Sequence, residues 1–408
     1  MELSDIDLVN PDRWVKGVPH EELRLLRHKA PVFWQDMPGN DAGFWAVTKY
    51  EDVVMISKDP GTFSSYRGTT LLKDMDQEGL DTSRTIMLNM DPPQHSKYRK
   101  LVSQGFTPRM TAQLEPRIRK ATVEILDQIA ARGSCDFVRE IAAELPLIVI
   151  AELVGIPIED RNKVFEWSNR LIGFDDPEFQ NTEAEGKAAA MEMWLYANQL
   201  AEQRQRDPKD DLVSLLMTSA VDGEKLTEME FDSFFLLLAV AGNETTRNLI
   251  SGGMLALIEN PSEWQKLLAN PSLVPTAVEE MLRWVSPVSQ FRRTAMRDTQ
   301  IRGQQIKEGD KVVVYYQSAN RDEDVFKDPY TFDVTRSPNN HIAFGIGEHF
   351  CLGANLARLE IRVMFEEILK RMPDIQLAGP VRRLRSNFIN GIKEMPVKFT
   401  PARAGAAG

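Results

Sequence analysis

Cysteine is scarce in this chain of 408 residues, which contains only Cys135 and Cys351. Two cysteines cannot build the framework of a disulfide-stapled secreted domain, so a reducing compartment is expected. Basic residues are also in the minority, with 49 Lys and Arg against 60 Asp and Glu. The formal charge of −11 argues against a nucleic-acid-binding surface and for an ordinary soluble protein.

Long apolar runs are missing too. The best candidate, Phe234–Gly242, is about half as long as the roughly 18 uncharged residues that a membrane-spanning helix needs. The acidic start, Met1 to Asp7, lacks the basic and apolar regions of an export signal. We therefore expect a cytoplasmic protein without a membrane anchor.

Hydrophobic residues, 42% of the chain, suffice for a sizeable core. Apolar residues recur at helical spacing over Met110–Ala131, Phe137–Val154, Ala188–Gln203 and Leu226–Glu259. Strand-like segments are few and short: Gly43–Val47, Lys311–Tyr315 and Val397–Phe399. The pattern predicts a mainly α protein with a small sheet near each end.

The length allows two or three domains, but the chain shows no repeat and no linker. We expect a single domain over residues 1–408, with a loose tail at 402–408. Three stretches, Tyr66–Arg84, Gly173–Asn181 and Asp322–Asn340, are predicted to be long loops. The first two suit a lid or substrate entrance, and a simple surface insertion is an equal alternative.

The most informative segment is Phe344–Gly353, in which Cys351 follows two glycines and precedes a helix-like stretch. Gly345 and Gly347 permit a tight turn and a close approach to a flat partner. The amides after the cysteine would stabilise a thiolate. Haem is a flat partner whose iron accepts an axial cysteine.

Three other interpretations of this loop remain open. A phosphate-binding glycine loop would need a third glycine at position 350, but this chain has Phe350 there, so the dinucleotide-binding fingerprint is incomplete. A nucleophilic Cys351 could pair with His349, although residues two apart seldom face each other correctly. A buried structural thiol is the default for a lone cysteine.

A carboxylate interrupts the apolar helical stretch 226–259, where Glu244 and Thr245 follow Gly242. An unpaired buried acid is costly, so Glu244 is expected at a watery cleft or in proton transfer, with a solvated helix face as the alternative. Gly242 and back-bonding threonines also favour a local widening of the helix.

Two residue pairs are weak evidence of function by themselves, one an acid with a base and the other two potential cations. Glu280 and Arg283 share a helix face at i,i+3, and His95 and Arg99 share one at i,i+4. The cationic pair could grip an anion, although a solvated face explains it as well.

Together, in this order, these segments resemble the cytochrome P450 haem-thiolate monooxygenases. The resemblance spans Asp7 to Phe399 and implies the P450 fold, a large helical domain with small N-terminal and C-terminal β-sheets around a buried haem b. It implies Cys351 as the axial iron ligand. Other haem contacts implied by family position are His95, Arg99, Ala241, Gly242, Arg293, Phe344, Gly345, His349 and Gly353.

The resemblance gives the basic residues a purpose, since the haem propionates require charge-assisted donors: His95, Arg99, Arg293 and His349. It also implies that Arg336 completes an architectural network with Glu280 and Arg283.

Glu244 and Thr245 match the family's catalytic acid–alcohol pair, with glutamate in place of the commoner aspartate. The implied role is proton delivery during dioxygen activation, which favours dioxygen and electrons over hydrogen peroxide. A peroxygenase, a haem-binding sensor or gas carrier, and a thiol hydrolase are the alternatives.

Finer similarity points to the bacterial branch that hydroxylates terpenoids, methyl-branched lipids and sterol side chains. An apolar, elongated substrate is expected, with pocket walls that include Met87, Val240, Val288, Phe291 and Phe388. The chain has no flavin domain and no iron–sulfur cysteine cluster. Electrons should come from a separate ferredoxin and its reductase, docked to this monomer through Lys97, Lys100, Arg109 and Arg358.

Overall fold

The computed structural model describes residues 1–39, 41–180, 182–221 and 223–401. The predicted tail at 402–408, like Asn181 at the end of a predicted loop, lies outside the described residues. Within the described ranges, no helix combines the length and the apolar character needed to cross a bilayer.

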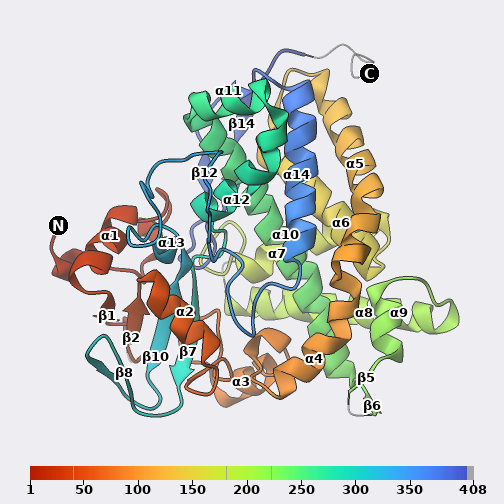
Figure 1. Ribbon diagram of the computed structural model, residues 1–408. Coiled ribbons are helices and arrows are strands. Elements are labelled where there is room, and N and C mark those ends of the chain that lie inside the picture. The colour runs from red at the N-terminus through yellow and green to blue at the C-terminus, as the bar shows by residue number, and fades with distance from the viewer. Residues whose placement is uncertain (40, 181, 222, 402–408) are drawn as a thin grey trace.

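Helices dominate the molecule, as the periodicity predicts (Figure 1). They are α1 His20–Lys29, α2 Tyr50–Lys58, α3 Gln77–Ser83, α4 Gln94–Ser103, α5 Pro108–Ala130, α6 Glu144–Val154, α7 Arg161–Ile172, α8 Glu183–Arg206, α9 Leu212–Thr218, α10 Glu228–Glu259, α11 Pro261–Ala269, α12 Val274–Val285, α13 Tyr316–Ala319 and α14 Ala354–Arg371.

The strands form small sheets. The largest has five strands in the order β1-β2-β10-β7-β3, which are Val32–Gln35, Phe44–Val47, Lys311–Tyr315, Gln290–Ala295 and Phe63–Ser64. The shorter strands are β4 Ser134–Asp136, β5 Ala220–Val221, β6 Glu224–Lys225, β8 Thr299–Ile301, β9 Gln304–Ile306, β11 Gln376–Leu377, β12 Arg382–Arg383, β13 Ile392–Glu394 and β14 Pro396–Lys398.

Long-range pairing joins the two ends of the chain to its middle. Strand β10 runs parallel to β2 and antiparallel to β7, so Lys311–Tyr315 belongs to the N-terminal sheet. Strand β14 lies between β11 and β4, which pairs the C-terminal segment with residues that follow α5. The fold is thus helical with small sheets near the N-terminal and C-terminal segments, as expected.

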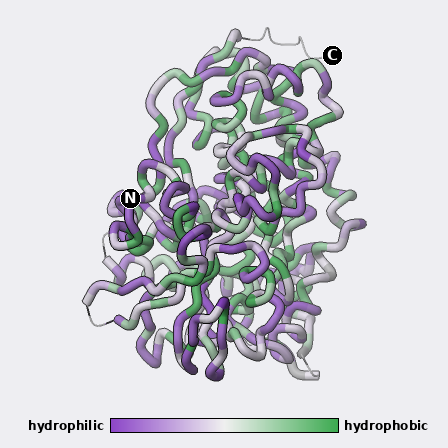
Figure 2. Tube along the Cα trace, turned by 60° about the vertical axis from the view of Figure 1, so that its left-hand side comes forward, coloured by the Kyte–Doolittle hydropathy of each residue, from purple (hydrophilic) through white to green (hydrophobic). Residues whose placement is uncertain are grey.

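Helix α10 runs through the centre of the helical part and packs on α6, α8, α12 and α14 (Figure 1). A capping box starts it, because the Thr227 hydroxyl accepts from the Glu230 N–H and the Glu230 carboxylate accepts from the Thr227 N–H. Hydrophilic and hydrophobic stretches alternate along the coloured Cα trace, as they do in amphipathic elements (Figure 2). Helix α10 is thus packed by helices from several distant parts of the chain.

Three local expectations were wrong. The predicted loop Tyr66–Arg84 contains α3, whose first turn is capped by Asp76 accepting from the Gly79 N–H at 2.8 Å. The predicted helix Phe137–Val154 begins as a π-helix over Val138–Ala142 before α6. Helix α10 is α-helical throughout Glu228–Glu259, without the π-type widening expected near Gly242.

Candidate active site

The Phe344–Gly353 loop closes on itself immediately before α14. The Cys351 N–H donates to the Phe344 carbonyl at 2.9 Å, and Gly345 and Gly347 have φ of +70° and +80°. A Cβ on Gly347 would lie 2.3 Å from the Ser57 carbonyl oxygen. The close approach that requires this glycine is therefore to the end of α2, rather than to a flat ligand.

One cavity brings most of the predicted residues together. Its walls come from α4, α10, the residues after α12, β7, the cysteine loop and the start of α14. The predicted residues that line it are Met87, His95, Arg99, Ala241, Gly242, Thr245, Val288, Phe291, Arg293, Phe344, Gly345, His349, Cys351 and Gly353. Glu244, Val240 and Phe388 are not among the lining residues.

Cys351 is one of the residues that line this cavity. Burial raises the pKa of Cys351, whereas the Gly353 N–H, Arg99 and Arg358 lower it. The expected support for a thiolate is therefore present, though it is opposed by burial. Metal ligation would remove the proton and relieve the desolvation of the sulfur.

Basic side chains gather at one edge of the cavity. The His95 and His349 rings lie 4.2 Å apart between centroids, and His95 Nδ1 is buried without a partner. Burial, followed by Arg293 and His95, lowers the pKa of His349 to about 2. Burial also lowers the pKa of Arg293, whose Nη1 donates to the Arg292 carbonyl at 2.9 Å.

Arg293 and Arg99 bring positive charge to these residues, whereas the imidazoles, whose pKa values are lowered by burial, bring hydrogen-bonding nitrogens. No ion pair to a carboxylate is formed by His95, Arg293 or His349 within the described residues. Such a set fits a ligand that brings its own anionic groups, as the propionates of haem do. Two nitrogen atoms of the Arg99 guanidinium already form hydrogen bonds, since they donate to the carbonyls of Glu348 at 3.2 Å and Phe350 at 2.5 Å.

The middle of α10 also lines the cavity. The Thr245 hydroxyl donates to the Ala241 carbonyl at 2.9 Å, the back-bonding expected of a helical threonine. Ala241 is exposed to the cavity although α10 is otherwise mostly buried. A Cβ on Gly242 would come within 2.9 Å of Ile150 Cδ1, so this glycine also serves the packing of α10 on α6.

Glu244 lies on another face of α10, only 1% exposed and ion-paired to Arg247. Arg247 also donates to Asn169 Oδ1 on α7 at 3.0 Å, while Glu244 Oε1 has no partner. Burial raises the pKa of Glu244, and Arg247 opposes that shift. The alternative of a solvated surface acid is wrong.

Apolar side chains form the rest of the cavity wall. Met87, Val288 and Phe291 lie there, as predicted. Phe388 stands behind Phe291, with ring centroids 5.8 Å apart, and packs with Leu384 and Ile389 in a separate cluster. Lining residues that the sequence analysis missed include Leu88, Leu237, Leu238, Leu249 and Glu360.

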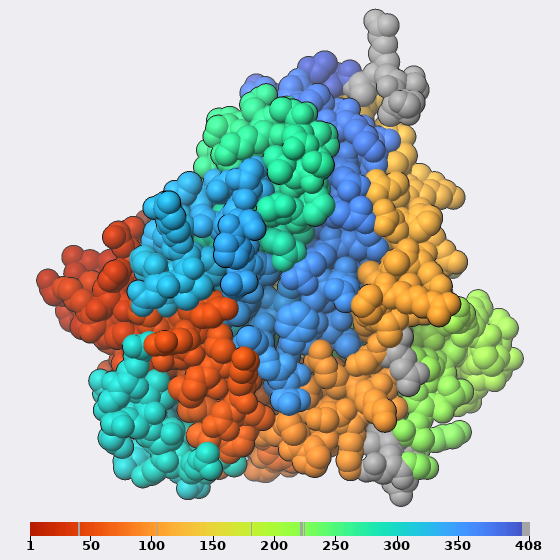
Figure 3. Space-filling view, in the orientation of Figure 1, coloured from red at the N-terminus to blue at the C-terminus, as the bar shows by residue number. Residues whose placement is uncertain are grey.

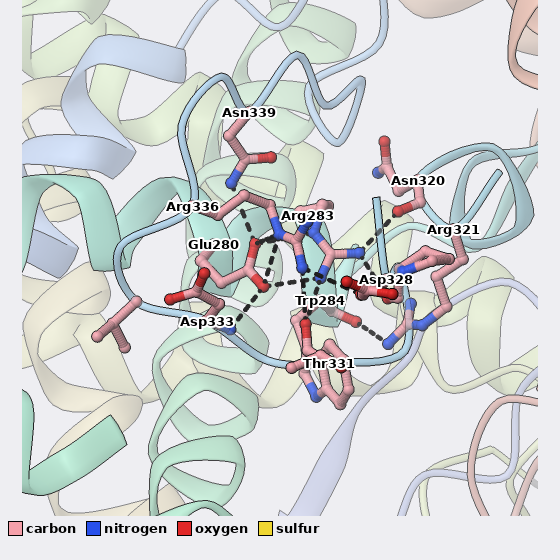
Figure 4. Close-up of polar contacts among 12 residues, drawn as sticks. Glu280, Arg283, Trp284, Asn320, Arg321, Asp328, Thr331, Asp333, Arg336 and Asn339 are labelled. Atoms are coloured by element: carbon pink, nitrogen blue, oxygen red, sulfur yellow. Dashed lines mark hydrogen bonds and ion pairs between the residues drawn. The ribbon is translucent and has the colours of Figure 1, made fainter. Parts of the chain in front are cut away.

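The expected architectural network is confirmed (Figure 4). Arg283 donates to Glu280 at 2.8 Å and 2.7 Å, and both side chains are fully buried. Arg336 Nε adds a bond to Glu280 at 3.0 Å, and Asn339 adds another at 3.1 Å. The network fixes the end of α12 against the segment that leads to the cysteine loop.

Known proteins share this fold and sequence. The family model for cytochrome P450 matches residues 160–373. A steroid C26-monooxygenase of Rhodococcus jostii is 44% identical over 98% of this chain and 86% of its own. A methyl-branched lipid omega-hydroxylase of Mycobacterium tuberculosis is 43% identical over 98% of this chain and 95% of its own.

A solved structure, the Mycobacterium marinum P450 CYP268A2 in complex with pseudoionone, superposes with a TM-score of 0.91 at 41% identity, covering 97% of this chain and 98% of that one. The chain belongs to the cytochrome P450 family. It is a haem-iron monooxygenase that combines dioxygen, electrons from a redox partner and a hydrophobic substrate.

Proposed function

We propose that this P450 hydroxylates an elongated, apolar molecule of the terpenoid, methyl-branched lipid or sterol side-chain type. The carrying observation is one cavity that is lined by Cys351, by Thr245 on α10 and by many apolar side chains. Such walls bind hydrocarbon by burying its surface and offer few polar groups to fix a polar one. The relatives named for steroid C26 and for the omega end of methyl-branched lipids support this class.

The cofactor that we propose is haem b, with Cys351 as its axial ligand. When bound, haem supplies dioxygen activation and transfer of one oxygen atom to a C–H bond. His95, Arg293 and His349 would hold its propionates, because they surround the cavity edge without carboxylate partners. Arg99 would act through the cysteine loop, whose carbonyls it binds.

Proton delivery is assigned to Thr245 and Glu244. The Thr245 hydroxyl reaches the cavity and is held by the Ala241 carbonyl, so its lone pairs are left to accept from substrate-side groups. The ion pair between Glu244 and Arg247 must break before the Glu244 carboxylate can exchange a proton with the cavity side of α10. Burial raises the pKa of Glu244, which favours its protonated form relative to a solvated glutamate, although Arg247 opposes that shift.

Electrons are proposed to come from a separate ferredoxin and its reductase. The exposed surface of α14 lies between α5 and α12 on one face of the molecule (Figure 3). Lys97, Lys100 and Arg109 are exposed on α4 and α5 and suit an acidic partner. Arg358 is less available, because it donates to Glu279 at 2.7 Å and 2.9 Å and lies over the Phe344 ring.

Spectroscopy on the holoenzyme tests the thiolate first. Reduction under carbon monoxide should place the Soret band at the long-wavelength thiolate position, and a band elsewhere would remove Cys351 as the ligand. Titration with monoterpenoids, branched fatty acids and sterones should then displace the iron's water ligand for at least one class. Product formed with reduced ferredoxin and dioxygen, and not with hydrogen peroxide alone, would separate a monooxygenase from a peroxygenase.

A further inference from the structure

A second cavity of about 440 Å³ lies beyond the first along α10. Its walls combine the N-terminal segment around Lys16 and His20, the last turns of α10, the end of α12 at Trp284, and Arg321 and Arg383. Neither Cys351 nor Thr245 lines it. It is therefore a site apart from the haem cavity.

Arg321 is the unusual residue of this cavity. This residue is 2% exposed, and its Nε and Nη1 are buried without hydrogen-bond partners in the part of the chain that the structure describes. Its Nη2 donates to the Trp284 carbonyl at 2.8 Å, and its guanidinium carbon lies 4.6 Å from the Trp284 ring centroid. Figure 4 shows this side chain directed away from the Glu280–Arg283 pair, with its dashed contact ending at Trp284.

Such a guanidinium is costly to bury. The neighbouring Arg283 is neutralised by Glu280, and Arg27 by Glu323, whereas Arg321 forms no ion pair among the residues that the structure describes. A buried charge without a partner is unfavourable, because its desolvation is not offset by an opposite charge. Burial, followed by Arg283, lowers the pKa of Arg321 to about 9, so it is still a cation at neutral pH.

Further donors face the same space. Arg383 is half-buried and likewise has no ion pair in the described ranges. Two carboxylates, Glu21 and Glu259, also line the cavity, and Glu259 acts on the pKa of Arg383. His20 Nδ1 is buried without a partner. Burial and then Arg321, Arg27 and Arg383 lower the pKa of His20 well below its ordinary value, so the ring is neutral and available to donate one hydrogen bond.

We propose that this cavity binds a small organic oxyanion, with its carboxylate or phosphate held by Arg321 and Arg383 and its apolar part against Leu255, Val285 and Ile392. Two guanidinium groups with unused donors provide charge-assisted, forked hydrogen bonds to such a group. A bare inorganic anion would leave part of this cavity unfilled, and the apolar lining residues suit the apolar part of a larger organic anion. Binding would tie the N-terminal segment to the β12–β13 hairpin, since both carry lining residues.

Calorimetry on the holoenzyme tests the proposal, with inorganic phosphate and benzoate as probes and benzamide as the uncharged analogue. At least one anion should bind and benzamide should not compete with it. Arg383→Gln should weaken binding by tenfold or more. Glu259→Gln should tighten it, because it removes a lining carboxylate that interacts electrostatically with Arg383. Arg206→Gln, an equal charge change on an exposed turn of α8, should have no effect.

Hydrogen exchange localises the site: amides of residues 16–21 and 382–394 should exchange more slowly with the anion bound. The proposal is overturned if neither anion binds, or if Arg383→Gln binds as the wild type does. Benzoate binding that shifts the Soret band and is unchanged in Arg383→Gln belongs to the haem cavity and also counts against it. If Arg383→Gln fails to fold, unchanged affinity in Glu259→Gln overturns the proposal instead.

Discussion

The Thr245 hydroxyl donates a hydrogen bond to the Ala241 carbonyl at 2.9 Å, one turn earlier on the wall of the haem cavity. The adjacent Glu244 turns its carboxylate to Arg247, away from that cavity. The two members of the proposed proton relay therefore occupy different faces of α10. Proton transfer between them requires either a side-chain movement or intervening water.

Removing the hydroxyl is the direct test of this relay. Thr245→Ala should lower product per electron pair by several-fold and release hydrogen peroxide instead, because dioxygen is still reduced without correct proton delivery. Folding should change by less than about 1 kcal/mol, since the lost hydrogen bond is local. Thr245→Ser is the matched control and should retain coupling. Unchanged peroxide release in Thr245→Ala would exclude the relay.

Arg293 should matter for haem retention more than for folding. Arg293→Gln removes a buried cation from the cavity edge, so haem should transfer to apomyoglobin several-fold faster. Arg297→Gln changes the same charge at an exposed position just after β7 and should leave the transfer rate as in the wild type. Equal rates for both variants would contradict a propionate role for Arg293.

Gly347 tests the packing of the cysteine loop. Gly347→Ala combines a left-handed φ of +80° with a Cβ 2.3 Å from the Ser57 carbonyl, so the loop must move. Gly303→Ala has a similar φ of +85° but no atom within 4 Å of the new Cβ. Chemical denaturation should show an additional loss of about 1–3 kcal/mol for Gly347→Ala over Gly303→Ala. Equal losses would show that φ strain alone accounts for the requirement for glycine.

Asp175, in the turn after α7, should make stability fall as pH rises. Burial raises its pKa from 3.8 to about 6, although Arg385 and Lys73 oppose the shift. The folded state thus holds this proton more tightly than the unfolded chain, so its contribution is full below pH 3.8 and lost as pH rises through about 6.

Asp175→Asn should remove that dependence. As pH rises from 4 to about 7, the free energy of unfolding of the variant should increase relative to that of the wild type, so the variant becomes the relatively more stable protein. Asp210→Asn, at an exposed position, should run parallel to the wild type over this range. Parallel curves for Asp175→Asn would show that the carboxyl keeps its ordinary pKa.

The long helices could be predicted from local pattern, whereas the short helix α3 and the π-helical segment before α6 could not. The apolar period over 226–259 predicted α10 to within two residues, because a long buried helix repeats its signal over many turns. Helix α3, by contrast, is a short and largely polar segment started by Asp76, so no apolar period marks it. The π-helical start at Val138 shares the apolar spacing of the α-helix after it.

The side-chain arrangement of the site, too, could be predicted from the sequence only in part. Arg247 was missed although it stands three residues after Glu244, the same spacing that identified Glu280 and Arg283. That spacing permits an ion pair but cannot tell which face of the helix is buried. The second cavity gave no sequence signal, because Lys16, Arg321 and Arg383 are scattered along the chain.

By itself, the sequence determined the helical class, the cysteine loop and the family resemblance, since each depends on neighbouring residues and their spacing. The tertiary structure decided which side chains share a cavity and which are turned from it. It brought Thr245 and Cys351 to one cavity, directed Glu244 to Arg247, and left Arg321 buried without an ion pair among the described residues. The reason is physical: the direction and desolvation of a side chain depend on elements packed from distant parts of the chain.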